Sequence, residues 1–390
     1  MFERNTGAVR PGAWALFASL MVLAACLRAP VTGVGPVLEM LQQALGLRAS
    51  TAGMLMTLPL LMFSVGSLFA SGLARRWGLG TTIFVALLVI ICGILLRSAG
   101  TAAALFAGTA VIGIGIALGN VLLPGLIKSD LPEHVPLATS LSGVAMGVVG
   151  ALASVCVVPL ALAFGWQIGL AAVVVFPLAA LILWALRVPP AGGGGSERTG
   201  DRLWRSPLAW QITLYMGLNS LMFYTMASWL PAILAESGFS PLVAGSLHGE
   251  MQLASALPGV FLGPVIARVT DQRPAAVIMA LIMGGAVVGL LLYPAWAALW
   301  VALFGFGSTG CFLLAMMFMA FRTHSPEQAA SLSGMAQFLG YLLAAAGPTL
   351  AGSLHEWGGG WQVPLQVGVG ITLLMAVCGA LAGRNRKIGD

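Results

Sequence analysis

The chain has 390 residues, of which 59% are hydrophobic and only 8% are charged. Soluble proteins carry about 25% charged residues, so this composition excludes a set of soluble domains, and the high apolar content excludes a disordered chain. The formal net charge of +6 comes from basic residues scattered singly along the chain, which excludes a nucleic-acid-binding surface. The composition therefore predicts a polytopic membrane protein.

Twelve apolar segments are long enough to cross a bilayer as helices, which takes about 20 residues each. They lack the two-residue alternation of a transmembrane β-strand, so we predict an all-α membrane protein with 12 transmembrane helices. Glycine, proline and charged residues separate the segments. In chain order they are 13–44, 50–74, 79–97, 101–127, 137–163, 166–187, 207–236, 241–268, 274–293, 295–321, 327–355 and 360–383.

The first segment allows a second interpretation. The sequence LAAC at residues 23–26 follows two arginines and an apolar run, which is the pattern of a lipoprotein signal peptide. Cleavage there would truncate the first span and leave an odd number of spans, so we expect an uncleaved helix. The five cysteines lie in apolar stretches without metal-ligand spacing, and we interpret them as small core residues.

Basic residues are distributed very unevenly between the two sides of the predicted bundle. With twelve spans, fifteen of the 18 lysines and arginines fall on the side of the two termini, and Arg48 and Arg97 fall on the other. Cytoplasmic loops of membrane proteins carry an excess of lysine and arginine. The distribution therefore predicts that both termini are cytoplasmic, in a bacterial-type inner membrane, and it supports the number of spans.

The chain divides into two similar halves. Residues 188–206 contain two prolines, a run of glycines and mixed charges, and they predict a flexible cytoplasmic linker between six-helix bundles at 1–187 and 207–390. Four matching segments occur in the same order at offsets of 191 to 195 residues, which is typical of two parallel repeats in a transporter. The matches are 52–53 with 244–245, 132–133 with 326–327, 138–143 with 329–334 and 165–167 with 360–362.

Three motifs carry a resemblance to a known family. They are LRAPVTGVGP at residues 27–36, GNVLLP at residues 119–124 and MAQFLGY at residues 335–341. With the twelve predicted spans, the chain resembles the CynX/NimT (cyanate/2-nitroimidazole permease) group of the major facilitator superfamily. The resemblance implies two pseudo-symmetric bundles that rock about a central solute site, and a protein that works as a monomer.

The loop after the second span departs from the pattern of that superfamily. Ala74 stands where an aspartate is usual, while Arg75 and Arg76 remain. We expect these arginines to form a cytoplasmic gate without the usual carboxylate. The loop after the eighth span offers Arg268, Asp271 and Arg273 as an alternative charge cluster.

Arg28 is the strongest candidate for solute binding. It lies near the middle of the first span, where a cation costs about 2.5–3.5 kcal/mol and normally faces a cavity. A guanidinium is a planar fork of donors, so it predicts a clamp for an anion or an acceptor-rich group. The alternative is a structural ion pair between helices. Thr32, in the same motif, is included in the predicted solute site.

Carboxylates and a histidine inside the spans are candidates for proton coupling or gating. Glu250 lies near the middle of the eighth span, and it is predicted to carry a proton, to pair with Arg28 or to hydrogen-bond to a neighbouring helix. His248 is a second candidate for proton handling. Glu39 lies toward the outer end of the first span, as an entrance or gate residue or as a solvated carboxylate.

Polar and aromatic residues of three further spans complete the predicted site. Residues 215, 219, 222, 226 and 229 share one face of the seventh span, and the repeat sets residues 223 and 224 opposite Arg28. A polar stripe at residues 333, 337 and 341 is expected to face protein or water. Helix packing is the alternative in each case, and for the seventh span an interfacial aromatic belt is another. The predicted solute-binding residues are Arg28, Thr32, Asn120, Asn219, Phe223, Tyr224, Gln337 and Tyr341.

No phosphate-binding loop, metal-ligand spacing or nucleophile motif appears in the sequence. We therefore expect a secondary transporter without a cofactor, not an enzyme. The expected solute is a small polar molecule or a cyanate-like anion. Moving a charge against the membrane potential costs about 2.3 kcal/mol per 100 mV, and an anion that enters together with a proton avoids this cost. The alternatives are a transporter of neutral nitroheterocycles, a drug exporter, a non-transporting membrane receptor and a channel.

Overall fold

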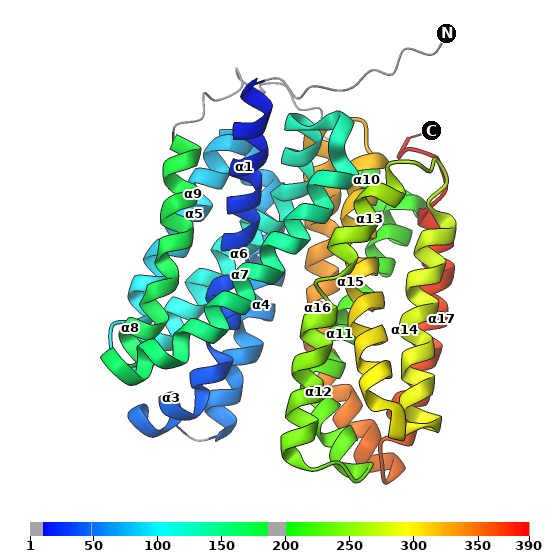
Figure 1. The fold of residues 1–390 in the computed structure, drawn as a ribbon. Helices are drawn as coiled ribbons and strands as arrows, with labels where there is room; N and C mark the ends of the chain where they lie inside the picture. Colours follow the sequence, from blue (N-terminus) through cyan, green and yellow to red (C-terminus); the bar gives the residue numbers. More distant parts are fainter. Residues whose placement is uncertain (1–10, 48, 186–199, 390) are drawn as a thin grey trace.

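The computed structural model describes residues 11–47, 49–185 and 200–389, and regular structure in these ranges is helical throughout. The helices run roughly side by side, and α1 (Pro11–Cys26) begins at the end of the molecule where α17 (Gln362–Ala382) finishes (Figure 1). We call this the terminal end, and the other the opposite end. Most of the predicted linker lies outside the described residues, and its last part forms α10 (Gly200–Arg205).

Eleven segments among the described residues are long and apolar enough to span a bilayer. This confirms the predicted all-α membrane fold. The continuous long helices are α4 (Ala49–Trp77), α5 (Leu79–Arg97), α6 (Ala102–Asp130), α7 (Val135–Phe164), α11 (Pro207–Glu236), α14 (Arg273–Leu292), α15 (Ala297–Phe321), α16 (Pro326–Gly358) and α17. The sixth span consists of α8 (Trp166–Ala171), a 3-10 turn η3 (Ala172–Val174) and α9 (Val175–Ala185).

Two of the twelve predicted spans are broken. The first, expected as one helix, is α1, α2 (Ala29–Thr32), η1 (Gly35–Val37) and α3 (Leu38–Leu45). The eighth is α12 (Pro241–Ala254) and α13 (Pro258–Ile266), so neither piece alone reaches the length of a span. Proline lacks the backbone N–H that continues a helix, and Pro30 and Pro258 each stand at a break.

Close helix packing depends on glycine. A Cβ atom at Gly108 would lie 2.3 Å from the backbone N of Arg97, and one at Gly115 would lie 2.7 Å from Ile90 Cγ1, so α5 and α6 touch through their backbones. In the second half, a Cβ at Gly307 would lie 2.8 Å from the N of Met283. An apolar side chain gains little free energy by leaving lipid for a helix interface, so membrane helices associate through close van der Waals packing. Small residues allow that close approach.

The sequence repeat has a counterpart in the backbone. Gly46 and Gly238, which precede matching segments, have positive φ values of 62° and 90° and end their helices. Trp166 and Trp361, at another pair of matching positions, are each 6% exposed. The two halves therefore share a left-handed glycine before one pair of matching segments and a buried tryptophan at another.

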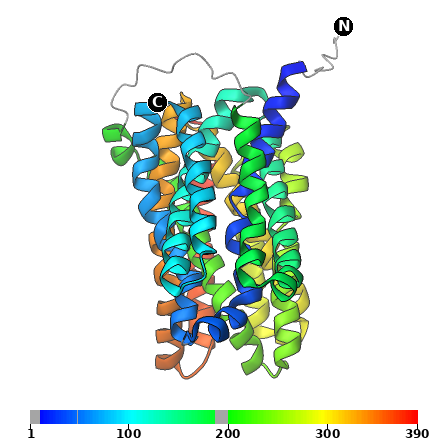
Figure 2. The ribbon, with the colours of Figure 1, turned by 90° about the vertical axis from the view of Figure 1, so that its left-hand side faces the viewer.

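The helices before and after residue 200 meet at the terminal end. Near the middle of α4 and α16, Ser64 Oγ donates to the carbonyl of Phe338 at 3.0 Å. At the terminal end, Arg75 Nη1 donates to Ser331 Oγ at 3.4 Å. Lys128 Nζ donates to the carbonyl of Ala320 at 2.7 Å. The two groups of ribbons diverge toward the opposite end, where α3 and the start of α12 lie (Figure 1). Figure 2 shows α3, in blue, at the same end from the side. The contacts of Arg75 and Lys128 close the terminal end.

Candidate functional site

Arg28 occupies the break between α1 and α2. Its backbone is at the N-cap of α2, and Pro30 follows within the first turn. Arg97, only 1% exposed, donates from Nη1 to the carbonyl of Pro30 at 2.6 Å and from Nη2 to the carbonyl of Leu170 at 3.3 Å. A buried carbonyl without a partner is costly, so this arginine stabilises the break. Sequence reasoning treated Arg97 only as a loop cation.

Contacts with α7 fix the backbone after Arg28. Thr32 Oγ1 donates to the carbonyl of Gly150 at 3.1 Å, and Ser154 Oγ donates to the carbonyl of Thr32 at 3.1 Å. A Cβ atom at Gly150 would lie 3.0 Å from Arg28 Cγ, so glycine leaves the room that the arginine stem fills. Arg28 is half-buried and forms no ion pair with a carboxylate among the described residues.

Two tyrosines of the second half lie within electrostatic range of Arg28. They are Tyr224 on α11 and Tyr341 on α16, and their ring centroids are 6.5 Å apart. Phe223 packs on Tyr224 at 5.3 Å, and Phe63 of α4 packs on Tyr341 at 5.2 Å. An aromatic row therefore crosses from one half to the other beside the cation. Sequence reasoning missed Phe63, because nothing distinguishes it from the apolar residues around it.

Gln337 lies one turn before Tyr341 on α16. It is 1% exposed, and its Nε2 donates to Ser333 Oγ at 2.8 Å. Its Oε1 is buried and has no hydrogen-bond partner among the described residues. A buried carbonyl oxygen in this state is a ready acceptor for a donor on a bound molecule.

The predicted stripe of the seventh span faces away from Arg28. Asn219 Oδ1 accepts a hydrogen bond from Ser308 Oγ at 3.1 Å, and Tyr215 OH donates to the carbonyl of Ala276 at 3.2 Å. Both contacts join α11 to other helices of the same half. Asn219 therefore links α11 to α15. Its role in solute binding stays a prediction.

Asn120 is buried on α6, where that helix meets the end of α1. A Cβ atom on the preceding Gly119 would lie 2.4 Å from Leu27 Cδ2, so α6 passes directly against the residue before Arg28. α6, the helix that carries Asn120, therefore also supports the break between α1 and α2.

The predicted proton-coupling residues lie on α12. His248 interacts with the backbone of Ala227 on α11, and its Nε2 is buried without a partner among the described residues. Glu250 is half-buried and forms no ion pair with Arg28 in the described part of the chain. The backbone of Glu39 belongs to α3, and its side chain lies outside the described residues. The roles expected for all three stay predictions.

The predicted gate arginines lie at the closed terminal end. Arg75 and Arg76 are exposed at the end of α4, and Arg75 reaches Ser331 of the other half. Lys128 makes the more extensive contact. Its Nζ donates to Thr323 Oγ1 at 3.0 Å and to the Thr323 carbonyl, besides Ala320. Sequence reasoning counted Lys128 only as a cytoplasmic base.

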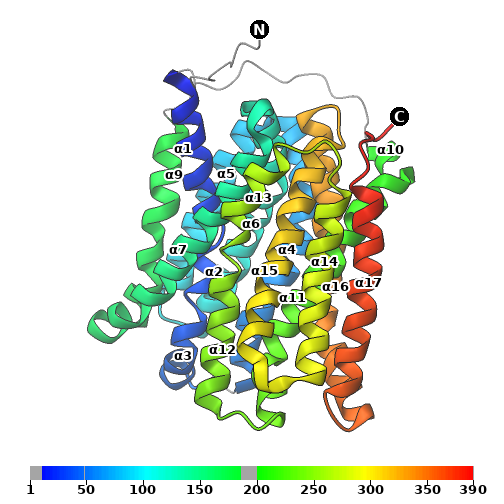
Figure 3. The same cartoon turned by 45° about the vertical axis from the view of Figure 1, so that its right-hand side comes forward.

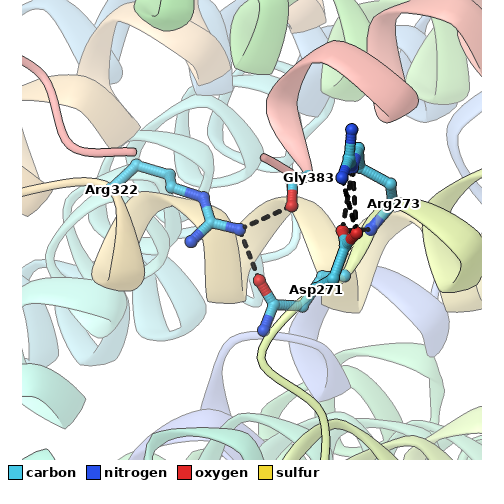
Figure 4. Close-up of polar contacts among 5 residues, drawn as sticks. Asp271, Arg273, Arg322 and Gly383 are labelled. Carbon is cyan, nitrogen blue, oxygen red and sulfur yellow. Dashed lines mark hydrogen bonds and ion pairs between the residues drawn. The ribbon is translucent and has the colours of Figure 1, made fainter. Parts of the chain in front are cut away.

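The loop after the eighth span adds a second charge cluster at this end (Figure 4). Asp271 pairs with Arg273 at 2.8 Å, and this contact lowers the pKa of the Asp271 carboxyl. Arg322, which is 3% exposed, donates to the carbonyls of Ala382 at 3.1 Å and Gly383 at 3.0 Å, and to the Gln272 side chain. Burial lowers the pKa of Arg322 to about 10. Arg268 is exposed and stands apart from this network.

Comparison with known proteins identifies the family. The sequence profile of the Major Facilitator Superfamily matches residues 20–348. The chain belongs to the Major Facilitator Superfamily. It is therefore a multi-pass membrane transporter, as the sequence motifs predict.

Two relatives of this chain carry the names of transporters. The chain is 47% identical over 378 residues to the 2-nitroimidazole transporter of Escherichia coli (strain K12), with 96% of each chain covered. It is 28% identical over 347 residues to the cyanate transport protein CynX of that organism, with 88% of this chain and 90% of the relative covered. The predicted resemblance to the CynX/NimT group is confirmed.

A solved structure shares the fold. The superfamily's proton:xylose symporter XylE, bound to 6-bromo-6-deoxy-D-glucose, superposes with a TM-score of 0.81 over 96% of this chain and 97% of that chain. The two sequences are 13% identical, so the likeness concerns the fold alone.

Proposed function

We propose that this chain transports a small, flat solute with an acceptor-rich group, of the nitroimidazole class, by alternating access. The observation that carries the proposal is Arg28. It stands at a helix break at mid-span, without a carboxylate partner among the described residues, and beside Tyr224 and Tyr341 of the other half. A cation in such a position is rarely retained without a function.

The chemistry of these side chains fits a nitroimidazole. The guanidinium fork matches two oxygens of a nitro group, and the tyrosine rings offer flat walls for an aromatic ring. The free Oε1 of Gln337 suits a ring N–H. The named activity of the relative at 47% identity supports this class.

A cyanate-like anion is the second candidate. Arg28 attracts negative charge, and a relative at 28% identity is named for cyanate transport. With an anionic solute, Glu250 or His248 would carry a proton, so that entry leaves the net charge unchanged. In this proposal the protein is a monomer of the bacterial inner membrane with cytoplasmic termini, and bundles 1–187 and 207–390, joined by the linker 188–206, rock about the central solute site.

Thermal stabilisation of the purified protein by ligands tests the solute class, because a ligand that binds only the folded state raises stability. The panel contains 2-nitroimidazole, cyanate and a bulky lipophilic cation. We expect 2-nitroimidazole to stabilise the wild type and the control Arg268→Ala, but not Arg28→Ala. Equal stabilisation of Arg28→Ala, or preference for the bulky cation, would overturn the proposal.

Transport itself is tested in proteoliposomes. We expect saturable counterflow of labelled 2-nitroimidazole in the wild type and its loss in Arg28→Ala. Binding without counterflow would indicate a receptor instead. Unsaturable flux would indicate a channel.

A further inference from the structure

A cavity lies inside the C-terminal half, away from Arg28. Its volume is about 240 Å³, and α11, α14, α16 and α17 form its walls. An engineered apolar cavity of about 150 Å³ is large enough to bind benzene. This cavity therefore has room for an organic group of at least that size. Its walls include Met222, Met226, Trp229, Ala351, Trp361 and Leu365.

The lining is almost entirely carbon. Its polar side-chain atoms are the hydroxyl of Thr225 and the indole nitrogens of Trp229 and Trp361. The Trp229 nitrogen already donates to the carbonyl of Pro348 at 2.7 Å. A buried water needs two to four polar partners, so these walls do not suit water. They suit a hydrocarbon group.

The cavity has an open side toward the membrane. α17 forms the outer edge of the second group of helices (Figure 3), and it packs mainly on α11 and α14 and far less on α16. The seam between α16 and α17 is flanked by Leu350, which is 59% exposed, and Val367, which is 43% exposed. Leu350 is nine residues after Tyr341, half a turn away in direction, so it points away from the central site.

The side of the cavity toward the opposite end is closed by a polar cap. The rings of Trp229 and Trp361 lie 5.0 Å apart, and His355 stacks on Trp361 at 4.4 Å. Glu236 accepts from the backbone N of Trp361 at 3.2 Å and contacts His355 Nε2 at 3.2 Å. Access is therefore sideways, from the hydrocarbon of the bilayer, and not from water.

We propose that this cavity binds the acyl chain of a membrane phospholipid, which enters between α16 and α17. Lipid acyl chains are the apolar groups that surround this face of a membrane protein, so an acyl chain is the expected occupant. The same helices carry both sites, because Thr225 of the cavity directly follows Tyr224 of the solute site. The lipid therefore contacts a helix that takes part in solute binding.

The two cavity tryptophans allow a direct test. The protein is reconstituted in phosphatidylcholine nanodiscs, with or without bromine at mid-chain, and quenching of tryptophan emission is measured. Ala351→Phe fills the cavity. Ala346→Phe is the matched control, because Ala346 is exposed on the same helix and does not line the cavity.

We expect bromolipid to quench the wild type and Ala346→Phe alike, and Ala351→Phe less. The difference should approach a fifth of total emission, since two of the 11 tryptophans line the cavity. Ala351→Leu, a milder change, should give an intermediate loss if Ala351→Phe does not fold. In a protein that also carries Trp229→Phe and Trp361→Phe, Ala351→Phe should leave the quenching by bromolipid unchanged. Equal quenching of all folded variants would overturn the proposal. The readout does not depend on the identity of the transported solute.

Discussion

Replacement of Lys128 by methionine should open the terminal end. Lys128 Nζ bonds to three oxygens of Ala320 and Thr323, at the C-terminal end of α15 and across the two halves. A charged hydrogen bond contributes about 1.5–3 kcal/mol, and a cation at a helix C-terminus about 0.3–1 kcal/mol. Because Lys128 is only half-buried, we take about 2 kcal/mol for the whole contact.

A loss of about 2 kcal/mol from the closed arrangement shifts its population relative to an open one by about 30-fold. The assay is the distribution of distances between spin labels at Arg76 and Arg268, both exposed at the terminal end. The exposed Cys92 and Cys156 are first replaced by serine. We expect a new population at longer distance in Lys128→Met, and the wild-type distribution in Lys128→Arg. An unchanged distribution in a folded Lys128→Met would refute the assignment of Lys128 as a latch.

Further predictions concern the site, the packing and the terminal loop. Arg28→Lys keeps the charge but loses the fork, so the dissociation constant of 2-nitroimidazole should rise about 10- to 100-fold in a binding titration. For an anionic solute that enters with a proton on Glu250, Glu250→Gln should abolish the pH dependence of uptake in proteoliposomes, and an unaltered pH profile would exclude Glu250 as the proton site and leave His248. Gly347→Ala should lower the melting temperature, because its Cβ would lie 2.3 Å from Thr225 Oγ1, whereas Gly370→Ala, with nothing within 4 Å, should not. The pKa of Asp271 is lowered in the folded chain, so its pair with Arg273 stabilises at pH values above the ordinary carboxyl pKa and stops doing so as the pH falls through the folded value. Asp271→Asn should remove that part of the acid dependence of melting, and an unchanged acid limb would contradict it.

The sequence predicts the helices well because membrane insertion depends on hydropathy along the chain. Breaks are harder to predict. The first span is one apolar run in sequence, yet its first helix ends at Cys26. Pro30 has no backbone N–H with which to continue that helix, and glycines follow it. The eighth span breaks before Pro258 although its hydropathy is continuous.

The candidate site was predictable where one residue is chemically conspicuous. Arg28 in an apolar span is such a signal, and the repeat leads from it to Tyr224. Most partners of Arg97, Lys128 and Arg322 are backbone carbonyls outside their own helices, and backbone carbonyls have no sequence signature. Their roles therefore appear only in three dimensions.

The two broken spans differ in mechanical character. In the first, Arg97 of α5 holds the carbonyls of Pro30 and Leu170 together, so the break is cross-braced by three segments. In the eighth, the turn is closed by local bonds, from Ala256 N to the carbonyl of Leu253 at 3.0 Å and from Leu257 N to that of Ala254 at 3.2 Å. The first break is thus held by a side chain from a third helix, whereas the eighth is held by local backbone bonds and by the packing of α12 on α15 and of α13 on α7. Because Arg97 ties the first break to α5 and α8, Arg28 should move with its half as one body during transport.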